Sequence, residues 1–222
     1  MPDPHPLDVE IRAGNVQLEG TLTLPAASSG IVLFAHGSGS SRHSPRNAFV
    51  AGTLHDAGVG TLLFDLLTVD EDRVYETRFD IDLLAKRLAA ATAWLRRRPE
   101  AAGLPIGYFG ASTGAGAALL AAAAAGAPVR AVVSRGGRPD LAGADALARV
   151  VAPTLLIVGG DDPQVITLNR QACALLQCTK ALKIVPGATH LFEEPGTLEQ
   201  VAVLAATWFR RWLGGVEGPA AG

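Results

Sequence analysis

Residues 107–116 read GYFGASTGAG, and this stretch decides the fold. An apolar strand runs into Gly110, Ser112 and Gly114, and a helix of small residues follows at 113–125. This G-x-S-x-G pattern, between a strand and a helix, sets a serine on a sharp turn with its Oγ exposed. The glycines are needed because side chains there would collide with the neighbouring strand and helix. Chance alone gives about 0.1 such patterns in a chain of this composition, so the stretch predicts Ser112 as a nucleophile.

Short apolar runs alternate with helical stretches on both sides of this turn. Such alternation is typical of a mostly parallel sheet with helices on both faces. Two alternating strands around Gly14-Asn15 predict an antiparallel hairpin before it. The eight expected strands cover residues 7–13, 16–24, 31–35, 59–64, 106–110, 129–134, 154–158 and 182–186. The expected helices cover residues 45–58, 80–98, 113–125, 141–150, 164–177 and 198–213.

Composition favours one globular α/β domain. Of the 222 residues 49% are hydrophobic and 18% are charged, so neither disorder nor a fibrous chain fits. We expect a single domain over residues 1–213 and a flexible tail at 214–222. The formal net charge is −2 and basic residues are not clustered, which argues against a nucleic-acid partner.

The cellular location expected from the sequence is the cytoplasm. The N-terminus has no basic start followed by an apolar run, and no apolar stretch approaches the roughly 20 residues of a membrane span. Cys173 and Cys178 lie five apart in one expected helix, a spacing that does not favour a disulfide. They are expected to be buried thiols in a reducing compartment.

A serine hydroxyl needs a base to take its proton, and the base needs a carboxylate to orient it. His190 follows the last expected strand, in PGATHLF, and Asp162 follows the strand before it, in GGDDPQV. Both stand at the carboxyl ends of parallel strands, where open α/β sheets place their sites. Asp161 is the competing carboxylate, and Asp162 is preferred for its spacing from Gly159.

Backbone N–H groups are expected to stabilise the oxyanion. Thr113, directly after the serine, offers one donor. The loop after the strand 31–35 offers the second, with Ser38 first and Gly39 next. His36, at the start of this loop, is interpreted as a structural histidine.

A dinucleotide-binding loop is the rival interpretation of the glycines. Gly110, Gly114 and Gly116 match the G-x-x-x-G-x-G spacing of short-chain dehydrogenases, but that loop follows the first strand of a chain, and here it follows about the fifth. Neither Tyr75 nor Tyr108 has a lysine four residues later. The nucleophile interpretation is therefore preferred.

With these motifs, the chain resembles a dienelactone hydrolase-like α/β hydrolase over nearly its whole length. The resemblance rests on HGSGSSRHSPRN (36–47), LLFDLL (62–67), GYFGASTGAG (107–116), LIVGGDD (156–162) and PGATHLFEEP (186–195). It implies the α/β-hydrolase fold, a triad of Ser112, Asp162 and His190, and hydrolysis of esters or lactones without a cofactor or metal. Dienelactone hydrolase itself uses a cysteine nucleophile, so its particular lactone is not carried over.

The expected site is open, since only residues 135–153 separate two strands where related folds insert a large cap. Residues 67–78 are interpreted as a plain loop. Without a lid, a small soluble ester is favoured over a triglyceride.

Several basic residues at this edge are candidate substrate contacts. Arg42, His43 and Arg135 are the first choices, and Arg46 or Arg138 could equally grip a substrate carboxylate. The alternative is that these arginines pair with Asp65, Asp140 or solvent.

Two further functions stay open at this point. One is a catalytically inactive binding protein of the same fold, and the other is a hydrolase of amide or thioester bonds. The expected partner is a small ester or lactone, with no membrane or nucleic-acid partner, and the sequence carries no signal for an oligomeric state.

Overall fold

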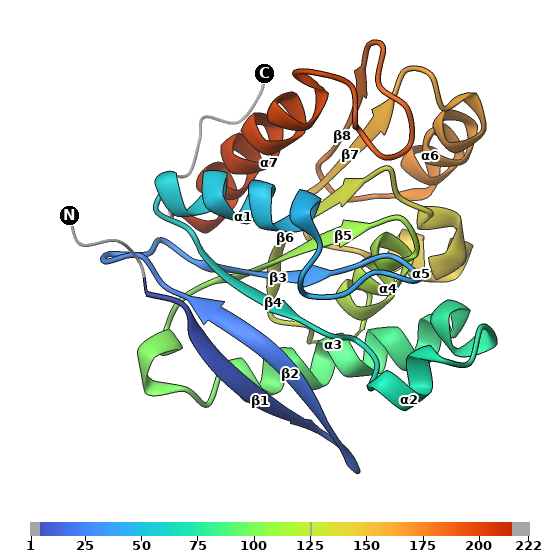
Figure 1. Cartoon of the computed structure of the whole chain (residues 1–222). Coiled ribbons are helices and arrows are strands. Elements are labelled where there is room, and N and C mark those ends of the chain that lie inside the picture. Colours follow the sequence, from blue (N-terminus) through green and yellow to red (C-terminus); the bar gives the residue numbers. More distant parts are fainter. Residues whose placement is uncertain (1–4, 125, 215–222) are drawn as a thin grey trace.

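A sheet of eight strands forms the centre of the protein (Figure 1). The computed structural model describes residues 5–124 and 126–214. The strands lie in the order β1-β2-β4-β3-β5-β6-β7-β8. They are β1 (Leu7–Ala13), β2 (Val16–Thr23), β3 (Ile31–Ala35), β4 (Gly60–Phe64), β5 (Ile106–Ala111), β6 (Val129–Arg135), β7 (Thr154–Gly159) and β8 (Lys180–Val185). β2 pairs antiparallel with both β1 and β4, and the other five pairings are parallel, which confirms the predicted fold class.

Helices cover both faces of the sheet. One face carries α1 (Pro45–Asp56) and α7 (Thr197–Leu213), and the other carries α3 (Ile81–Leu95), α4 (Thr113–Ala122), α5 (Ala144–Arg149) and α6 (Pro163–Leu175) (Figure 1). Strand side chains alternate between the two cores. In β3, Val32 and Phe34 pack with α1 and α7, whereas Leu33 packs with α3 and α4.

The segment after β4 differs from its prediction as a plain loop. It contains the short helix α2 (Val69–Asp72) and the 3₁₀ turn η1 (Glu76–Phe79). Thr68 and Glu71 form a capping box, in which each side chain accepts the other residue's backbone N–H. A four-residue helix carries no readable periodicity, so only the T-x-x-E spacing signalled it.

The cysteines and the C-terminal segment differ in part from what the sequence predicts. α6 ends at Leu175, so Cys178 lies beyond the helix that was expected to hold both cysteines. Both thiols are free, and they are partly exposed rather than buried as expected. The predicted flexible tail at 214–222 lies, from residue 215 on, outside the described residues. No helix in the described part of the chain is long and apolar enough to cross a membrane.

Candidate active site

Ser112 lies between β5 and α4 in a backbone conformation that residues with side chains rarely adopt. Its φ is 50° and its ψ −122°. A Cβ at Gly110 would lie 2.4 Å from the Cα of Ala115, and one at Gly114 would lie 2.1 Å from the carbonyl oxygen of Ala35. The backbone could not keep this turn with side chains at either position. The two glycines are therefore required, as the G-x-S-x-G pattern predicts.

His190 and Asp162 meet at the same edge of the sheet. Nδ1 of His190, in the loop after β8, lies 2.8 Å from Oδ2 of Asp162, which follows β7. The other carboxylate oxygen of Asp162 accepts the backbone N–H of Val165 over 3.3 Å, and so caps the N-terminus of α6. Asp161, the competing carboxylate, is exposed. The helix cap and the histidine together fix the orientation of the Asp162 carboxylate.

The end of β6 and the residues after it lie beside both Ser112 and His190. Ser112 donates its N–H to the carbonyl of Arg135 over 3.2 Å, and its carbonyl accepts the N–H of Arg138 over 3.0 Å. A Cβ at Gly136, between them, would lie 3.0 Å from the carbonyl oxygen of His190 and 3.7 Å from its Cε1. The predicted nucleophile and base therefore lie against the same short segment.

The two predicted oxyanion donors have different surroundings. Thr113 is the first residue of α4, so its N–H has no acceptor within the helix. The N–H of Ser38, in contrast, donates to Oγ1 of Thr113 over 2.9 Å, so it already has a protein acceptor. The loop still lies against the serine, since a Cβ at Gly37 would lie 3.1 Å from the Cβ of Ser112.

His36 is a structural residue of this loop, as the sequence predicts. It is buried, its Nε2 accepts the backbone N–H of Leu66 over 3.0 Å, and its Nδ1 lies 3.0 Å from the carbonyl of Gly37. A ring that accepts at Nε2 carries its proton on Nδ1, so Nδ1 donates to Gly37. Burial lowers the pKa of His36, which favours this neutral form.

Of the candidate substrate contacts, Arg42 is paired within the protein. Its guanidinium forms ion pairs with Asp65 and Glu19, and its backbone N–H donates to Asp65 over 2.7 Å. The expectation that it grips a substrate carboxylate is therefore not supported. Arg138 likewise pairs with Asp140, over 2.9 and 2.7 Å.

His43 and Arg135, two further candidate substrate contacts, differ in their exposure to solvent. His43 is exposed, and its backbone N–H donates to the hydroxyl of Ser41 over 3.2 Å. Arg135 is buried at the end of β6 and forms no ion pair with a described residue.

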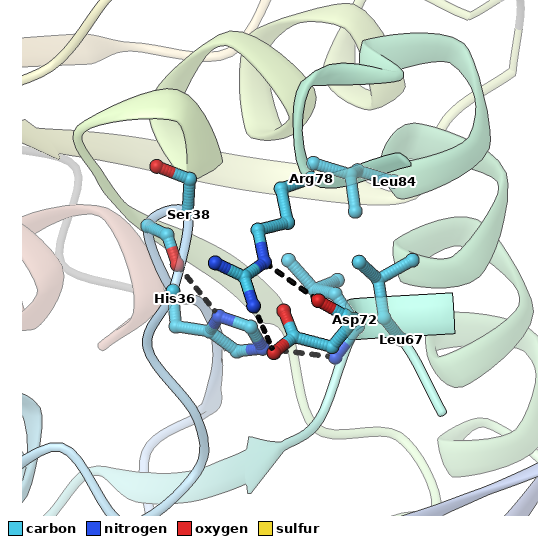
Figure 2. Close-up of a pocket in the computed structure, with 9 residues that line it drawn as sticks. His36, Ser38, Leu67, Asp72, Arg78 and Leu84 are labelled. Carbon is cyan, nitrogen blue, oxygen red and sulfur yellow. Dashed lines mark hydrogen bonds and ion pairs between the residues drawn. The ribbon is translucent and has the colours of Figure 1, made fainter. Parts of the chain in front are cut away.

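Figure 2 shows a small pocket between the predicted oxyanion loop and the segment after β4. Its volume is about 10 Å³, which is room for one water molecule. Arg78 donates from Nε to the carbonyl of Asp72 over 2.7 Å and from Nη2 to the Asp72 carboxylate over 3.1 Å. These bonds hold η1 against α2, and both residues line the pocket.

Glu194 is a residue of the site that sequence reasoning missed. Its carboxylate accepts the backbone N–H of Thr189 over 3.0 Å and the Thr189 hydroxyl over 2.6 Å. The backbone directly before His190 is therefore held by this carboxylate, while the ring is held by Asp162. An acid five residues after a loop threonine is too common a pattern to have signalled this role.

The chain has the α/β-hydrolase fold. Its sheet has the corresponding strand order, and a serine turn follows β5, an acid follows β7 and a histidine follows β8. The connection from β6 to β7 holds only the 3₁₀ turn η3 (Pro139–Ala142) and α5, so the described chain has no cap domain. The sequence profile of the dienelactone hydrolase family matches residues 69–212, and the chain belongs to this family of hydrolases. The family expected from the sequence is thus confirmed.

Two solved structures share the fold of this chain. A crystal structure of dienelactone hydrolase from Anabaena variabilis is 56% identical, with a TM-score of 0.92 over 95% of this chain and 99% of that one. The structure of Est1E from Butyrivibrio proteoclasticus, at 16% identity, has a TM-score of 0.78 over 91% and 97% of the two chains, and shares the fold. Curated relatives from two strains of Mycobacterium tuberculosis are 63% identical over 91% of this chain. They are named "Putative phosphoribosyl transferase", and the chain spans 45% of their length.

Proposed function

We propose that this chain is a serine hydrolase of small carboxylic esters or lactones, in which Ser112 is the nucleophile, His190 the general base and Asp162 its orienting acid. The observation that carries the proposal is the 2.8 Å contact between His190 Nδ1 and Asp162 Oδ2. The strained turn at Ser112, at the same sheet edge, supports it, because such strain is typical of functional sites.

The histidine contact determines the direction of proton transfer. With Nδ1 donating to Asp162, a neutral His190 has its lone pair on Nε2. In the proposed reaction Nε2 takes the proton of Ser112 as Oγ attacks the acyl carbon, and then gives it to the departing alcohol. A water molecule, activated by the same nitrogen, releases the acid from the acyl-enzyme. The charge of the tetrahedral intermediate is stabilised by the N–H of Thr113 and, once the Thr113 hydroxyl turns away, by that of Ser38.

The name of the longer relatives does not change this proposal. Because this chain matches less than half of their length, we assign the named phosphoribosyl transfer to the rest of those proteins. Amide and thioester hydrolysis use the same apparatus and are the alternatives within the class. A binding protein of the same fold without catalytic activity is the alternative outside the class of hydrolases.

Labelling with a fluorophosphonate tests the proposal directly. We expect mass spectrometry to find the adduct on Ser112, and Ser112→Ala to lose labelling and about 10⁴-fold of its ester hydrolysis. Ser40→Ala, on the neighbouring loop, is the matched control and should keep both. An unlabelled protein, or a Ser112→Ala variant with a tenth of the activity, would exclude Ser112 as nucleophile.

A further inference from the structure

Asn169, in the middle of α6, is a completely buried amide. It is 0% exposed, and its Nδ2 donates to the carbonyl of Gly137 over 2.9 Å and to that of Val165, on the same helix, over 2.8 Å. These two acceptors settle which way the amide points. Its Oδ1 is enclosed without a partner among the described residues. An apolar side chain of the same size would not carry this unpaired oxygen, so what Asn169 contributes are its two N–H donors.

The bond to Gly137 restrains a turn that has little else to hold it. Gly136 and Gly137 follow β6 and are buried, and Gly136 has a φ of 50°. Two successive glycines have many accessible conformations, and neither has a side chain that packs or forms hydrogen bonds. The carbonyl of Gly137 has no backbone donor among the described residues, and a buried carbonyl needs a donor. In the described part of the chain, Asn169 is the only side chain that bonds to the backbone of residues 136–138.

This turn lies against the proposed nucleophile and the proposed base. On one side of Gly137, the N–H of Arg138 donates to the carbonyl of Ser112 over 3.0 Å. On the other side, a Cβ at Gly136 would lie 3.7 Å from Cε1 of His190. Gly137 stands between these two contacts. A shift of its peptide group would therefore move the backbone that contacts both Ser112 and His190.

Asn169 belongs to the helix that begins at the proposed catalytic acid. Asp162 caps α6 and contacts His190. Asn169 lies seven residues later, about two helical turns, and so on the same side of the helix. Asp162 accepts the N–H of Val165, and Asn169 donates to the carbonyl of the same residue. One helix therefore carries both the acid that orients His190 and the amide that holds the turn beside Ser112.

We propose that Asn169 is a positioning residue of the proposed active site, which holds Ser112 and His190 at their working distance through the Gly136–Gly137 turn. Because Asn169 is completely buried, it acts through this turn and not on the substrate. The inference rests on the proposed function, and it adds a residue outside the triad and the oxyanion loop. A displacement of about 1 Å in reacting groups can lower a rate about 100-fold, so one hydrogen bond to the turn is sufficient for a large effect.

Asn169→Ser isolates the bond to Gly137. A serine hydroxyl can still donate to the carbonyl four residues earlier on the helix, but the side chain is one atom shorter and loses Gly137. We expect kcat for p-nitrophenyl acetate to fall about 10- to 100-fold. KM should change little, because acylation and deacylation both need the same geometry of Ser112 and His190. Asn169→Leu, which removes both donors and keeps the volume, should lose as much kcat.

Ala172→Gly is the matched control. Ala172 is buried on the same helix, three residues after Asn169, and has no side-chain donor. Glycine in the helix interior should lower Tm by about 2–4 °C and leave kcat unchanged well below Tm. If Ala172→Gly lost as much kcat as Asn169→Ser, the cause would be a general loosening of α6, and the proposal would be wrong. A folded Asn169→Ser protein with kcat within about twofold of wild type would also overturn it.

Amide hydrogen exchange separates this proposal from the proposed function, because it needs no turnover. The N–H groups of Ser112 and Arg138 are both bonded within the segment that Asn169 holds, so Asn169→Ser should accelerate their exchange. Ala172→Gly should accelerate exchange only within α6. Unchanged exchange at Ser112 and Arg138 in Asn169→Ser would overturn the proposal. A wild-type protein that neither hydrolyses esters nor reacts with a fluorophosphonate would reject the proposed function, and faster exchange in Asn169→Ser would still support the anchoring of the turn.

Discussion

The backbone N–H of Ser38 donates to the hydroxyl of Thr113 over 2.9 Å, and so joins the loop after β3 to the residue that follows Ser112. Both residues were expected to face a substrate oxygen with their N–H groups. Since one N–H serves two acceptors poorly, the Thr113 hydroxyl competes with the substrate oxygen for Ser38. The bond therefore stabilises the free protein with a donor that the proposed transition state would use.

Thr113→Val tests this competition, because valine keeps the shape and the backbone N–H but removes the acceptor. We expect stability to fall by about 0.5–1.5 kcal/mol, the net contribution of one hydrogen bond, while kcat for a small ester rises or stays the same. Chemical denaturation and steady-state rates measure the two effects. A fall in kcat of tenfold or more would show that the hydroxyl assists the reaction and does not compete with it.

The fold could be predicted because its signals are local. Each buried strand is a short apolar run bounded by turn residues, and the sharp turn at Ser112 needs glycine at Gly110 and Gly114. The acid and the histidine follow from the positions of β7 and β8 in the sheet. Each proposed site residue can therefore be found from the strand that it directly follows in the sequence.

The sequence offered Asp65 and Asp140 as alternative partners of the arginines, and they are the partners of Arg42 and Arg138. It did not offer Asn47, which lies 88 residues from Arg135. Sequence spacing alone does not say which distant side chains fold within reach of a guanidinium. The bond from Ser38 to Thr113 spans 75 residues and escaped prediction for the same reason.

The two roles of Asp162 can be separated by substitution. Asp162→Asn keeps an oxygen for the cap of α6 but loses the charge beside His190, so we expect a loss of about 10⁴-fold in kcat with little change in Tm. Asp162→Ala removes the cap as well, and should cost about 1 kcal/mol more in stability. Activity near the wild-type level in Asp162→Asn would require another group to orient His190.

His36 should make stability depend on pH. Burial lowers its pKa below the unfolded value of 6.5, so between these two values the unfolded chain binds a proton that the folded chain does not. Stability is therefore complete above pH 6.5 and falls as the pH decreases through this window. The protonated ring could no longer accept the N–H of Leu66.

Denaturation curves from pH 8 to pH 5 measure this effect. His36→Gln, which can still accept from Leu66, should flatten the fall in stability. His55 is the matched control, because burial also lowers its pKa but it is only half-buried, so His55→Gln should flatten the curve less. An unchanged slope in His36→Gln would mean that other groups cause the acid sensitivity.

The open site predicts a preference for short acyl chains. The described chain has no cap, so we expect kcat/KM to be highest for acetyl to butyryl esters and to fall for longer chains, with no jump when the substrate passes its solubility limit. Each CH₂ that is buried would add up to about 0.8 kcal/mol, and an open site buries few of them. A series of p-nitrophenyl esters from acetyl to palmitoyl, in solution and as emulsions, measures this.

The segment that could overturn this expectation carries exposed apolar side chains. Val69, Tyr75 and Phe79 are 74%, 67% and 42% exposed, and the rings of Tyr75 and Phe79 lie 5.0 Å apart. If rates climbed steadily to palmitoyl, these side chains would be the surface that covers the acyl chain. Tyr75→Ser with Phe79→Ser would then restore a preference for short chains, whereas Val203→Ser, an exposed apolar residue on α7, would not. We expect instead that the double variant leaves hydrolysis of the acetyl ester and the optimum chain length unchanged, because a small acyl group does not reach η1.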